Sequence, residues 1–195
     1  MILYFDGAAE PVNPGGVATY GYVIYERIGT EEKKVKSSFG VACEPFSDCS
    51  TNNYAEYTAL VEGLSYLSKI YKGRVLVRGD SQLVVRQMNG IYSVRSPRIY
   101  PLYKKAMELK SSFSSVEFQW IPREMNEEAD KLSKAAYYEY LRNHPDVIRR
   151  FSSYFATPKQ ISLLRKLGYE VSEFMSKREA SKIISKALGK KGRLF

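Results

Sequence analysis

The chain has 195 residues, 44% of them hydrophobic, and a formal net charge of +9 at pH 7. That length supports one well-packed core and a small second unit. No segment approaches the roughly 18 consecutive apolar residues of a membrane span, and the first residues lack the basic segment of a secretory signal. We therefore expect a cytoplasmic protein, monomeric and without a membrane partner. Cys43 and Cys49 lack metal-site spacing, which predicts free thiols.

Three strands are predicted at the start of the chain, because the first two segments are rich in β-branched and aromatic residues and the third alternates in its first half. They cover 1–8, 17–28 and 33–42. The turn sequence GTEEK between the last two suits a hairpin. This part of the chain is therefore expected to form antiparallel strands.

The next part of the chain alternates between helical and strand patterns. Its predicted segments are helix 54–71, strand 74–80, helix 81–90, helix 102–113, strand 115–122 and helix 126–141. The order βββαβααβα predicts an α/β fold with a five-stranded mixed sheet and helices on both faces. In that sheet three antiparallel strands are followed by parallel crossover strands.

One charge stands on the expected apolar face of the helix 54–71. At about 3.6 residues per turn, Glu56 shares a face with Leu60 and Leu64. A capping box with Asn53 as its N-cap explains Glu56 locally. The alternative is a carboxylate directed into a functional site.

Other acidic residues also stand at the ends of predicted elements. Asp6 lies near the end of the first strand, Asp80 follows the fourth strand, and Asp130 lies in the first turn of the helix 126–141. Each has a simple local explanation as a turn residue, a helix cap or a surface charge. Ligands of open sheets bind beyond the carboxyl ends of the strands, where these acids and Glu56 could converge.

Five segments of the chain, YFDGA, NPGG, TNNYAE, RGDSQLV and IPREMNEEADKLS, resemble the successive motifs of type 1 ribonuclease H. The resemblance covers about residues 1–141 and implies the RNase H-like fold. It places the family's catalytic and metal-binding acids on Asp6, Glu56, Asp80 and Asp130. It also implies endonucleolytic hydrolysis of the RNA strand of RNA/DNA hybrids, which leaves 5′-phosphate and 3′-hydroxyl ends.

The chemistry explains why four acids would cluster. Neighbouring carboxylates repel one another unless divalent cations neutralise them, and hard oxygen ligands suit Mg²⁺ or Mn²⁺. Two such ions about 3.5 to 4 Å apart can activate a water and stabilise the leaving oxygen of a phosphodiester. We therefore expect two ions per active site and no covalent intermediate.

The same resemblance implies a set of substrate-binding residues. They are Gly7, Asn13, Gly15, Gly16, Thr51, Asn52, Asn53 and Gln82. The amides Asn13, Asn52 and Gln82 are expected along a shallow groove, where they can read ribose 2′-hydroxyls. Thr51 and Asn53 are implied to hold a phosphate of the DNA strand. The glycines let the backbone approach the RNA closely.

The chain departs from the better-known family pattern near the last acid. Arg123 stands where many members have a histidine; it can hold phosphate or product, but it cannot shuttle protons near neutral pH. Glu124, which stands beside it, could shuttle protons. The segment 89–101 is too short for the extra basic helix of some members. A broader nuclease that also cuts double-stranded RNA and a non-catalytic hybrid-binding module are the alternatives.

The net charge is concentrated at the C-terminus. Residues 1–140 carry 17 Lys and Arg against 17 Asp and Glu, whereas residues 141–195 carry 13 against 4. Such a tail indicates an appended unit for an anionic polymer, with a solvated lysine-rich helix as the alternative. We predict a catalytic domain over 1–142, a linker or bridging helix over 143–155, and a small basic helical domain over 156–195.

Two helices are predicted in the tail. The first has Thr157 as N-cap and Gly168 as C-cap, and its sequence, ATPKQISLLRKLG, resembles a small module appended to various nucleic-acid enzymes. The second has a capping box from Ser176 to Glu179 and is predicted to end at Gly189.

Overall fold

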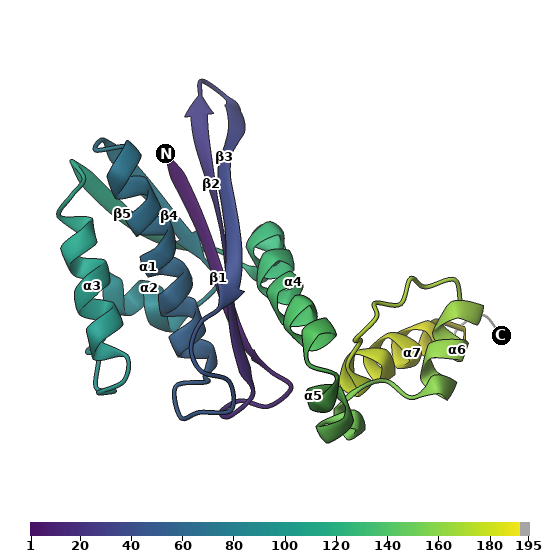
Figure 1. The fold of residues 1–195 in the computed structure, drawn as a ribbon. Helices are drawn as coiled ribbons and strands as arrows, with labels where there is room; N and C mark the ends of the chain where they lie inside the picture. Colours follow the sequence, from purple (N-terminus) through teal and green to yellow (C-terminus); the bar gives the residue numbers. More distant parts are fainter. Residues whose placement is uncertain (192–195) are drawn as a thin grey trace. The chain divides into compact units, whose positions relative to one another are not determined.

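Five strands form one mixed sheet, with the order β3-β2-β1-β4-β5 (Figure 1). The strands are β1 (Ile2–Glu10), β2 (Val17–Ile28), β3 (Glu31–Val41), β4 (Arg74–Gly79) and β5 (Ser115–Trp120). β2 pairs antiparallel with β1 and β3, whereas β4 pairs parallel with β1 and β5. The predicted fold class is confirmed. The computed structural model describes residues 1–191.

Four helices accompany the sheet, and a 3₁₀ turn, η1 (Arg123–Met125), precedes the last of them. They are α1 (Asn52–Ile70), α2 (Gln82–Met88), α3 (Tyr100–Lys110) and α4 (Glu127–Asn143). The predicted order of elements is confirmed, with shifts of a few residues at their ends. Figure 1 shows α1 and α3 on one side of the sheet and α4 on the other.

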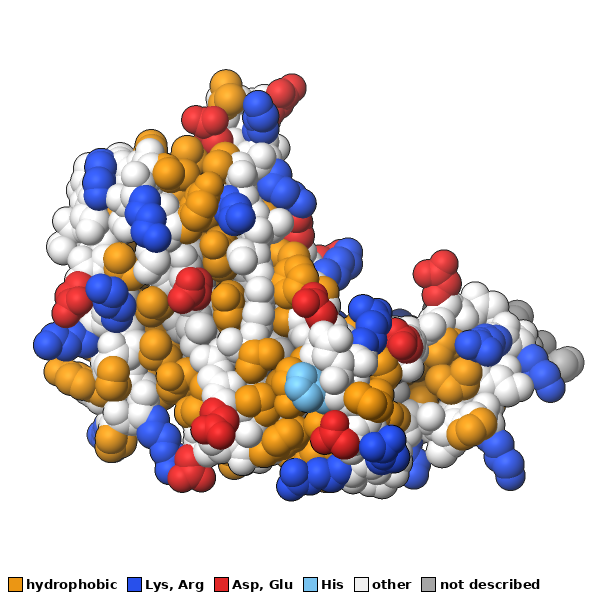
Figure 2. All heavy atoms as spheres, viewed as in Figure 1, with side chains coloured by type: hydrophobic (Ala, Val, Ile, Leu, Met, Phe, Trp, Pro, Cys, Tyr) orange, Lys and Arg blue, Asp and Glu red, His pale blue; other side chains and the backbone are white. Residues whose placement is uncertain are grey.

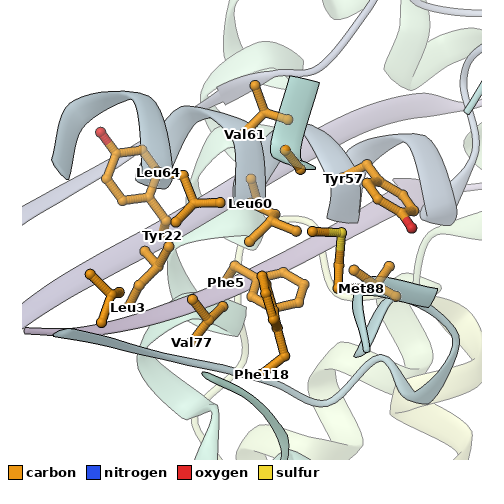
Figure 3. Close-up of a cluster of buried hydrophobic side chains, with 14 of the residues drawn as sticks. Leu3, Phe5, Tyr22, Tyr57, Leu60, Val61, Leu64, Val77, Met88 and Phe118 are labelled. Atoms are coloured by element: carbon orange, nitrogen blue, oxygen red, sulfur yellow. The ribbon is translucent and has the colours of Figure 1, made fainter. Parts of the chain in front are cut away.

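The main core lies between α1 and the sheet (Figure 3). Leu60 and Leu64 of α1 are fully buried, as are Leu3 and Val77 of the strands facing them. A Cβ atom on Gly63 would lie 2.5 Å from Leu3 Cδ1, so this glycine lets α1 approach β1 closely. The apolar face predicted for this helix is confirmed.

The start of α1 differs from the prediction. The helix begins at Asn52, and Thr51 is its N-cap, with Oγ1 accepting a hydrogen bond of 3.2 Å from the Tyr54 backbone nitrogen. The capping box with Asn53 as N-cap was therefore wrong. A threonine hydroxyl two positions earlier satisfies the free backbone donor, which leaves Glu56 available for another partner.

Strand β1 is longer than predicted. Its pairing with β2 continues to Glu10, opposite Val17, because both segments remain extended to that point. Asp6 is therefore in the middle of a strand, not near its end. The parallel pairing with β4, however, stops at Phe5 opposite Gly79, so Asp6 still follows the last parallel pair.

The chain divides into two compact units, Met1–Glu139 and Tyr140–Phe195. The second contains α5 (Pro145–Arg150), the 3₁₀ turn η2 (Ser152–Tyr154), α6 (Pro158–Lys166) and α7 (Lys177–Lys191). A small core of Leu164, Met175 and Ala180 holds it together. Figure 2 shows Lys and Arg side chains on its visible surface.

The helix ends of the second unit were partly predicted. Thr157 caps α6, with a full capping box to Gln160, and Gly168 follows the helix with a φ of 81°. The predicted end of α7 at Gly189 was wrong, since the helix continues to Lys191. A glycine ends a helix only where the chain adopts positive φ, which Gly189 does not.

No helix among residues 1–191 combines the length and the apolar composition that crossing a membrane requires. Cys43 and Cys49 are free thiols, as predicted.

Candidate active site

Asp6 and Asp80 stand at the point where the parallel pairing of β1 and β4 ends. The last pair of that ladder is Phe5 with Gly79, so each aspartate is the next residue along its segment. Asp6 is buried, and its Oδ2 accepts a hydrogen bond of 2.5 Å from Ser133 Oγ. The strand register thus places the two aspartates side by side at the end of the parallel pairing.

Ser133 reaches Asp6 because α4 packs very closely on the sheet. Gly21 of β2 is the cross-strand partner of Asp6. A Cβ atom on Gly21 would lie 2.6 Å from both Leu132 Cβ and the Ser133 backbone nitrogen. A larger residue at position 21 would therefore push α4, and Ser133 with it, away from the acid.

Glu56 enters the site through a second glycine contact. A Cβ atom on Gly7 of β1 would lie 2.3 Å from both the Ala55 carbonyl carbon and the Glu56 backbone nitrogen. The first turn of α1 can therefore lie directly against β1. Ser81, at the start of α2, donates a hydrogen bond of 2.8 Å to Glu56 Oε2. Glu56 thus reaches the strand ends and is not a capping residue.

Asp130 lies in the first turn of α4 and is held by two cations. The Arg123 guanidinium hydrogen-bonds to Asp130 Oδ1, and Lys134 Nζ lies 2.8 Å from Asp130 Oδ2. The Asp130 side chain is only 14% exposed, whereas that of Arg123 is 67% exposed. Among the interactions of residues 1–191, Asp130 is therefore the one acid of the four whose charge is compensated by direct ion pairs.

Asn126 connects the start of α4 to both central strands. Its Nδ2 donates to Asp80 Oδ1 at 2.7 Å and to the Phe5 carbonyl at 2.9 Å. The side chain is 1% exposed, and its buried Oδ1 has no hydrogen-bond partner among residues 1–191. A buried carbonyl oxygen without a donor is costly, which makes this atom available to a donor or a cation.

Burial and mutual repulsion perturb the acids. Burial, reinforced by Asp80 and Asp130, raises the pKa of Asp6 to about 6, although Ser133 and Arg123 act in the opposite direction. Burial also raises the pKa of Glu56 to about 8, with Asp6 and Asp80 adding to the shift.

The pKa of Asp130 is shifted in the opposite direction, below its ordinary value. Its burial alone would raise its pKa, but the hydrogen bonds and charges of Lys134 and Arg123 hold that pKa below its ordinary value. Asp6 interacts electrostatically with Asp80 and Asp130, and Glu56 with Asp6 and Asp80. The four predicted acids therefore lie in one region, in which cations neutralise Asp130 while burial raises the pKa of Asp6 and Glu56.

The donor set fits a hard divalent cation. No three His, Cys, Asp or Glu side chains within residues 1–191 form a ready-made metal site. The acids nevertheless supply only oxygen donors, as Mg²⁺ prefers, and burial, with the neighbouring acids adding to it, raises the pKa of Asp6 and Glu56. A cation at this point would favour the ionised forms of both acids.

Four of the predicted substrate-binding residues line one pocket of about 280 Å³. They are Asn13, Thr51, Asn52 and Asn53. Arg98 lines the same pocket and pairs with Asp48 at 2.8 Å. The pocket therefore combines neutral polar groups with one guanidinium, whose charge Asp48 balances.

The amides of this pocket are partly used within the protein. Asn52 Oδ1 accepts a hydrogen bond of 2.7 Å from the Ala9 backbone nitrogen, and Asn13 Oδ1 accepts one of 3.2 Å from the Asn52 backbone nitrogen. Both carbonyl oxygens therefore fasten the start of α1 to β1 and its loop. The amide NH₂ groups are the parts left for a ligand.

The predicted glycines have structural reasons of their own. Gly15 has a φ of 92°, which favours glycine, and open space around its Cα. A Cβ atom on Gly16 would lie 2.4 Å from the Glu10 carbonyl oxygen, so Gly16 closes the turn. Gly7, as described above, makes room for α1.

The remaining predicted residues are exposed. Gln82 follows Ser81 at the start of α2 and does not line the pocket of the other amides. Arg123 and Glu124 belong to η1, where Arg123 is committed to Asp130 and Glu124 is turned to solvent.

The sequence interpretation missed the polar residues that hold the acids in place. They are Ser81, Asn126, Ser133 and Lys134. A weak signal existed for three of them, because Asn126, Ser133 and Lys134 stand four before, three after and four after Asp130, on one side of a helix. Ser81 was predicted only as the first residue of the helix 81–90.

Comparison with known families identifies the N-terminal unit. Residues 16–136 match the model of the family described as "Reverse transcriptase-like". The chain belongs to this family. More closely, it carries an RNase H-like domain related to type 1 ribonuclease H, at about 30 to 35% identity.

Relatives of known sequence support this relation. Ribonuclease HI of Halobacterium salinarum is 34% identical over 133 residues, which span 68% of this chain and 62% of that protein. The bifunctional protein Rv2228c of Mycobacterium tuberculosis is 35% identical over 137 residues, or 70% of this chain and 35% of the relative. The chain thus spans about a third of the mycobacterial protein's length.

Solved structures agree. The N-terminal RNase H domain of Rv2228c has a TM-score of 0.65 at 32% identity, with 73% of this chain and 96% of that one covered. LC11-RNase H1, in complex with an RNA/DNA hybrid, has a TM-score of 0.62 at 34% identity, with 72% and 98% covered.

Proposed function

We propose that this chain is an endonuclease that hydrolyses the RNA strand of RNA/DNA hybrids and leaves 5′-phosphate and 3′-hydroxyl ends. The observation that carries the proposal is the convergence of Asp6, Glu56, Asp80 and Asp130, from four different parts of the fold, near the point where the parallel pairing of β1 and β4 ends. The hybrid bound to LC11-RNase H1 supports the choice of substrate. We assign catalysis to residues 1–142 and treat 143–155 as a linker to the basic unit at 156–195.

The four acids would hold the metal ions of this reaction. Two Mg²⁺ or Mn²⁺ ions bound to Asp6, Glu56, Asp80 and Asp130 would supply an activated water on one side of the phosphodiester and charge stabilisation at the leaving oxygen. The protein contributes the positions of the oxygens. Ser133 orients Asp6, Ser81 orients Glu56 and Asn126 orients Asp80, each through a direct hydrogen bond.

The hydrogen bonds of these orienting residues restrict carboxylates that repel one another. Without Asn126, for example, Asp80 would be free to rotate away from Asp6 and towards solvent. Supporting groups of this kind typically change metal affinity or activity by about 10- to 100-fold. Asn126 is therefore a positioning residue in the proposed mechanism.

Arg123 and Glu124 are proposed to act at the edge of the site. Arg123 remains charged at all working pH values, so it can hold a phosphate or the product but cannot transfer a proton. In the protein alone it neutralises Asp130. A substrate phosphate near Asp130 would compete for this guanidinium. Glu124 is exposed beside it and could exchange protons with water.

Substrate discrimination is assigned to neutral polar groups. The amide NH₂ groups of Asn13 and Asn52, together with the exposed amide of Gln82, can hydrogen-bond to ribose 2′-hydroxyls and base edges. Thr51 and Asn53, in the pocket beside Asn52, are proposed to contact a phosphate of the DNA strand. Gly7, Gly15 and Gly16 keep the nearby backbone free of side chains.

The test compares two glutamates of the same helix. Glu56→Gln preserves shape but removes a proposed metal ligand, whereas Glu62→Gln makes the same change on the exposed side of α1. Each variant is assayed with labelled RNA/DNA, RNA/RNA and DNA/DNA duplexes in Mg²⁺, Mn²⁺ or EDTA. We expect the wild type and Glu62→Gln to cut the RNA of the hybrid with either metal, and Glu56→Gln to lose several orders of magnitude in rate.

The outcomes separate the candidate functions. Hybrid binding without any cleavage by the wild type in either metal would indicate a non-catalytic hybrid-binding module. Equal cleavage of RNA/RNA would indicate a broader ribonuclease. Wild-type rates in Glu56→Gln, and in Asp80→Asn assayed in the same way, would refute the metal-site assignment.

A further inference from the structure

The outer face of α6, in the second unit, is basic and hollow. Lys159, Ser162, Arg165 and Lys166 are exposed and lie on one side of the helix, since each of the other three is three or four residues from Ser162. We call these four residues the α6 basic face. Ala156, Pro158 and Ile161 join three of them around a surface hollow of about 590 Å³.

The opposite side of α6 is fully used within its own unit. Leu164 is buried in the small core with Met175 and Ala180. Gln160 Nε2 donates to the Lys177 carbonyl at 3.3 Å and to Ser181 Oγ at 2.9 Å, which fastens α6 to α7. The four residues of the α6 basic face take part in none of these contacts.

The cations of the α6 basic face make no ion pair within the part of the chain that the structure describes. Lys159, Arg165 and Lys166 form no salt bridge with any other of residues 1–191, whereas Glu173, one of the four acids of the unit, pairs with Arg142 at 2.8 Å. Cations held on one face of a short helix repel one another mildly. An anionic ligand would remove that repulsion.

We propose that the α6 basic face binds the phosphate backbone of nucleic acid, as a second contact separate from the acid site. Two cations and the Ser162 hydroxyl surround the hollow, whose small neighbours Ala156 and Pro158 leave room for a phosphate group. Arg and Lys with a hydroxyl are the usual phosphate ligands in such interfaces.

The character of the face favours nucleic acid over a lipid surface. A helix that lies on a membrane inserts a row of large apolar side chains. The α6 basic face offers none, and Ile161 beside the hollow is only partly exposed. The choice of polymer rests on the proposed function, because a chain that cuts hybrids would gain affinity from a tethered backbone contact.

The chain offers a matched control for this face. Lys182 and Lys186 are also exposed, on α7 of the same unit, but line no part of the hollow. The test variant is Arg165→Gln with Lys166→Gln, and the control is Lys182→Gln with Lys186→Gln. Both remove two positive charges from the full chain, so a general effect of net charge is the same in each.

Binding is measured by fluorescence anisotropy with a labelled RNA/DNA duplex in EDTA, where no metal-dependent cleavage interferes. If the face makes two phosphate contacts, the slope of log K against log salt falls by about 1.8 in the test variant. When salt rises from about 50 to about 200 mM, the wild type should therefore lose about 12-fold more affinity than the test variant. We expect the control to keep the wild-type slope, and both variants to keep the wild-type turnover number at saturating hybrid.

Three results would overturn the inference. They are an unchanged slope in the test variant, an equal fall in both variants, and binding to phosphatidylserine vesicles that exceeds binding to the duplex and is lost in the test variant. The proposed function is judged separately. A wild type that binds through α6 but never cleaves would refute the nuclease and leave this surface standing.

Discussion

The candidate active site in the first unit is acidic and buried, whereas the α6 basic face in the second unit is positively charged and exposed. In the first, Asp6 and Glu56 are enclosed by the sheet and helices, and burial raises the pKa of both. In the second, Arg165 and Lys166 stand on the surface of a helix, where water solvates them. Buried charge must be oriented by neighbours and acts at short range, whereas surface charge acts through attraction that salt screens.

This comparison implies that the two sites respond differently to mutation. Removing a group that orients a buried acid should impair chemistry, whereas removing a surface cation should change affinity only. The buried acids should also lower the free energy of unfolding of the metal-free protein, whereas the exposed cations of the α6 basic face should not. Three further experiments address the acid site, in order of decreasing expected effect.

Asn126→Ala should lower the turnover number by about 10- to 100-fold, because Asp80 loses its hydrogen bond from Nδ2. Stability should fall by about 1 to 3 kcal/mol, since the Phe5 carbonyl also loses its donor. Asn89→Ala is the control: Asn89 Nδ2 donates to the Phe118 carbonyl at 3.1 Å, away from the acids.

Steady-state kinetics and thermal unfolding check both variants. We expect Asn89→Ala to lose stability but keep its turnover number. If the two variants lost turnover equally, Asn126 would be a structural residue and not a positioning one.

Glu56→Gln should stabilise the metal-free protein, and more so as pH rises. The pKa of Glu56 is raised from its ordinary 4.5 to about 8. Between these values the unfolded chain has already released the proton that the folded chain retains, so the folded state loses stability with rising pH. Glutamine has no such dependence.

Thermal unfolding in EDTA from about pH 5 to about pH 9 measures this difference. We expect the melting temperature of Glu56→Gln to exceed that of wild type by a few degrees at the high end and to match it at the low end. Mg²⁺ should narrow the gap by stabilising wild type. A constant gap across the range would contradict the assignment, as would the same trend in Glu62→Gln.

Arg123→Gln should have the smallest effect on stability, below about 1 kcal/mol, because the ion pair with Asp130 is largely exposed on the arginine side. The pKa of Asp130 should rise, since one of its two cations is lost. Carboxylate titration by NMR measures this shift. Lys131→Gln, which removes an exposed pair with Glu127 on the same helix, should leave Asp130 unchanged.

Local patterns predicted most of the elements but not all of their ends. The strand 17–28 and the helix at 81–90 were located by their residue types, and the structure has them at almost the same places. The start of α1 was wrong because Thr51, Asn52 and Asn53 are all good caps, and only the packed helix selects among them.

The supporting residues of the site could not be predicted in the same way. Asp130 was identified from its motif, but its partner Arg123 was interpreted only as a phosphate ligand. Asn126 is part of the same motif, yet its hydrogen bond to the Phe5 carbonyl crosses 121 positions of the chain. Nothing in a local pattern indicates such a contact.

The sequence by itself determined the order of the elements and the separation of a neutral body from a basic tail, and its motifs led to the four proposed acids. Those properties depend on short-range periodicity, on motifs and on composition. Only the tertiary structure decided which acids are buried, which are neutralised and which neighbours hold them. Burial and hydrogen bonding arise when α4 and α1 close against β1 and β2, through glycines at positions 7 and 21 whose importance depends on what packs there.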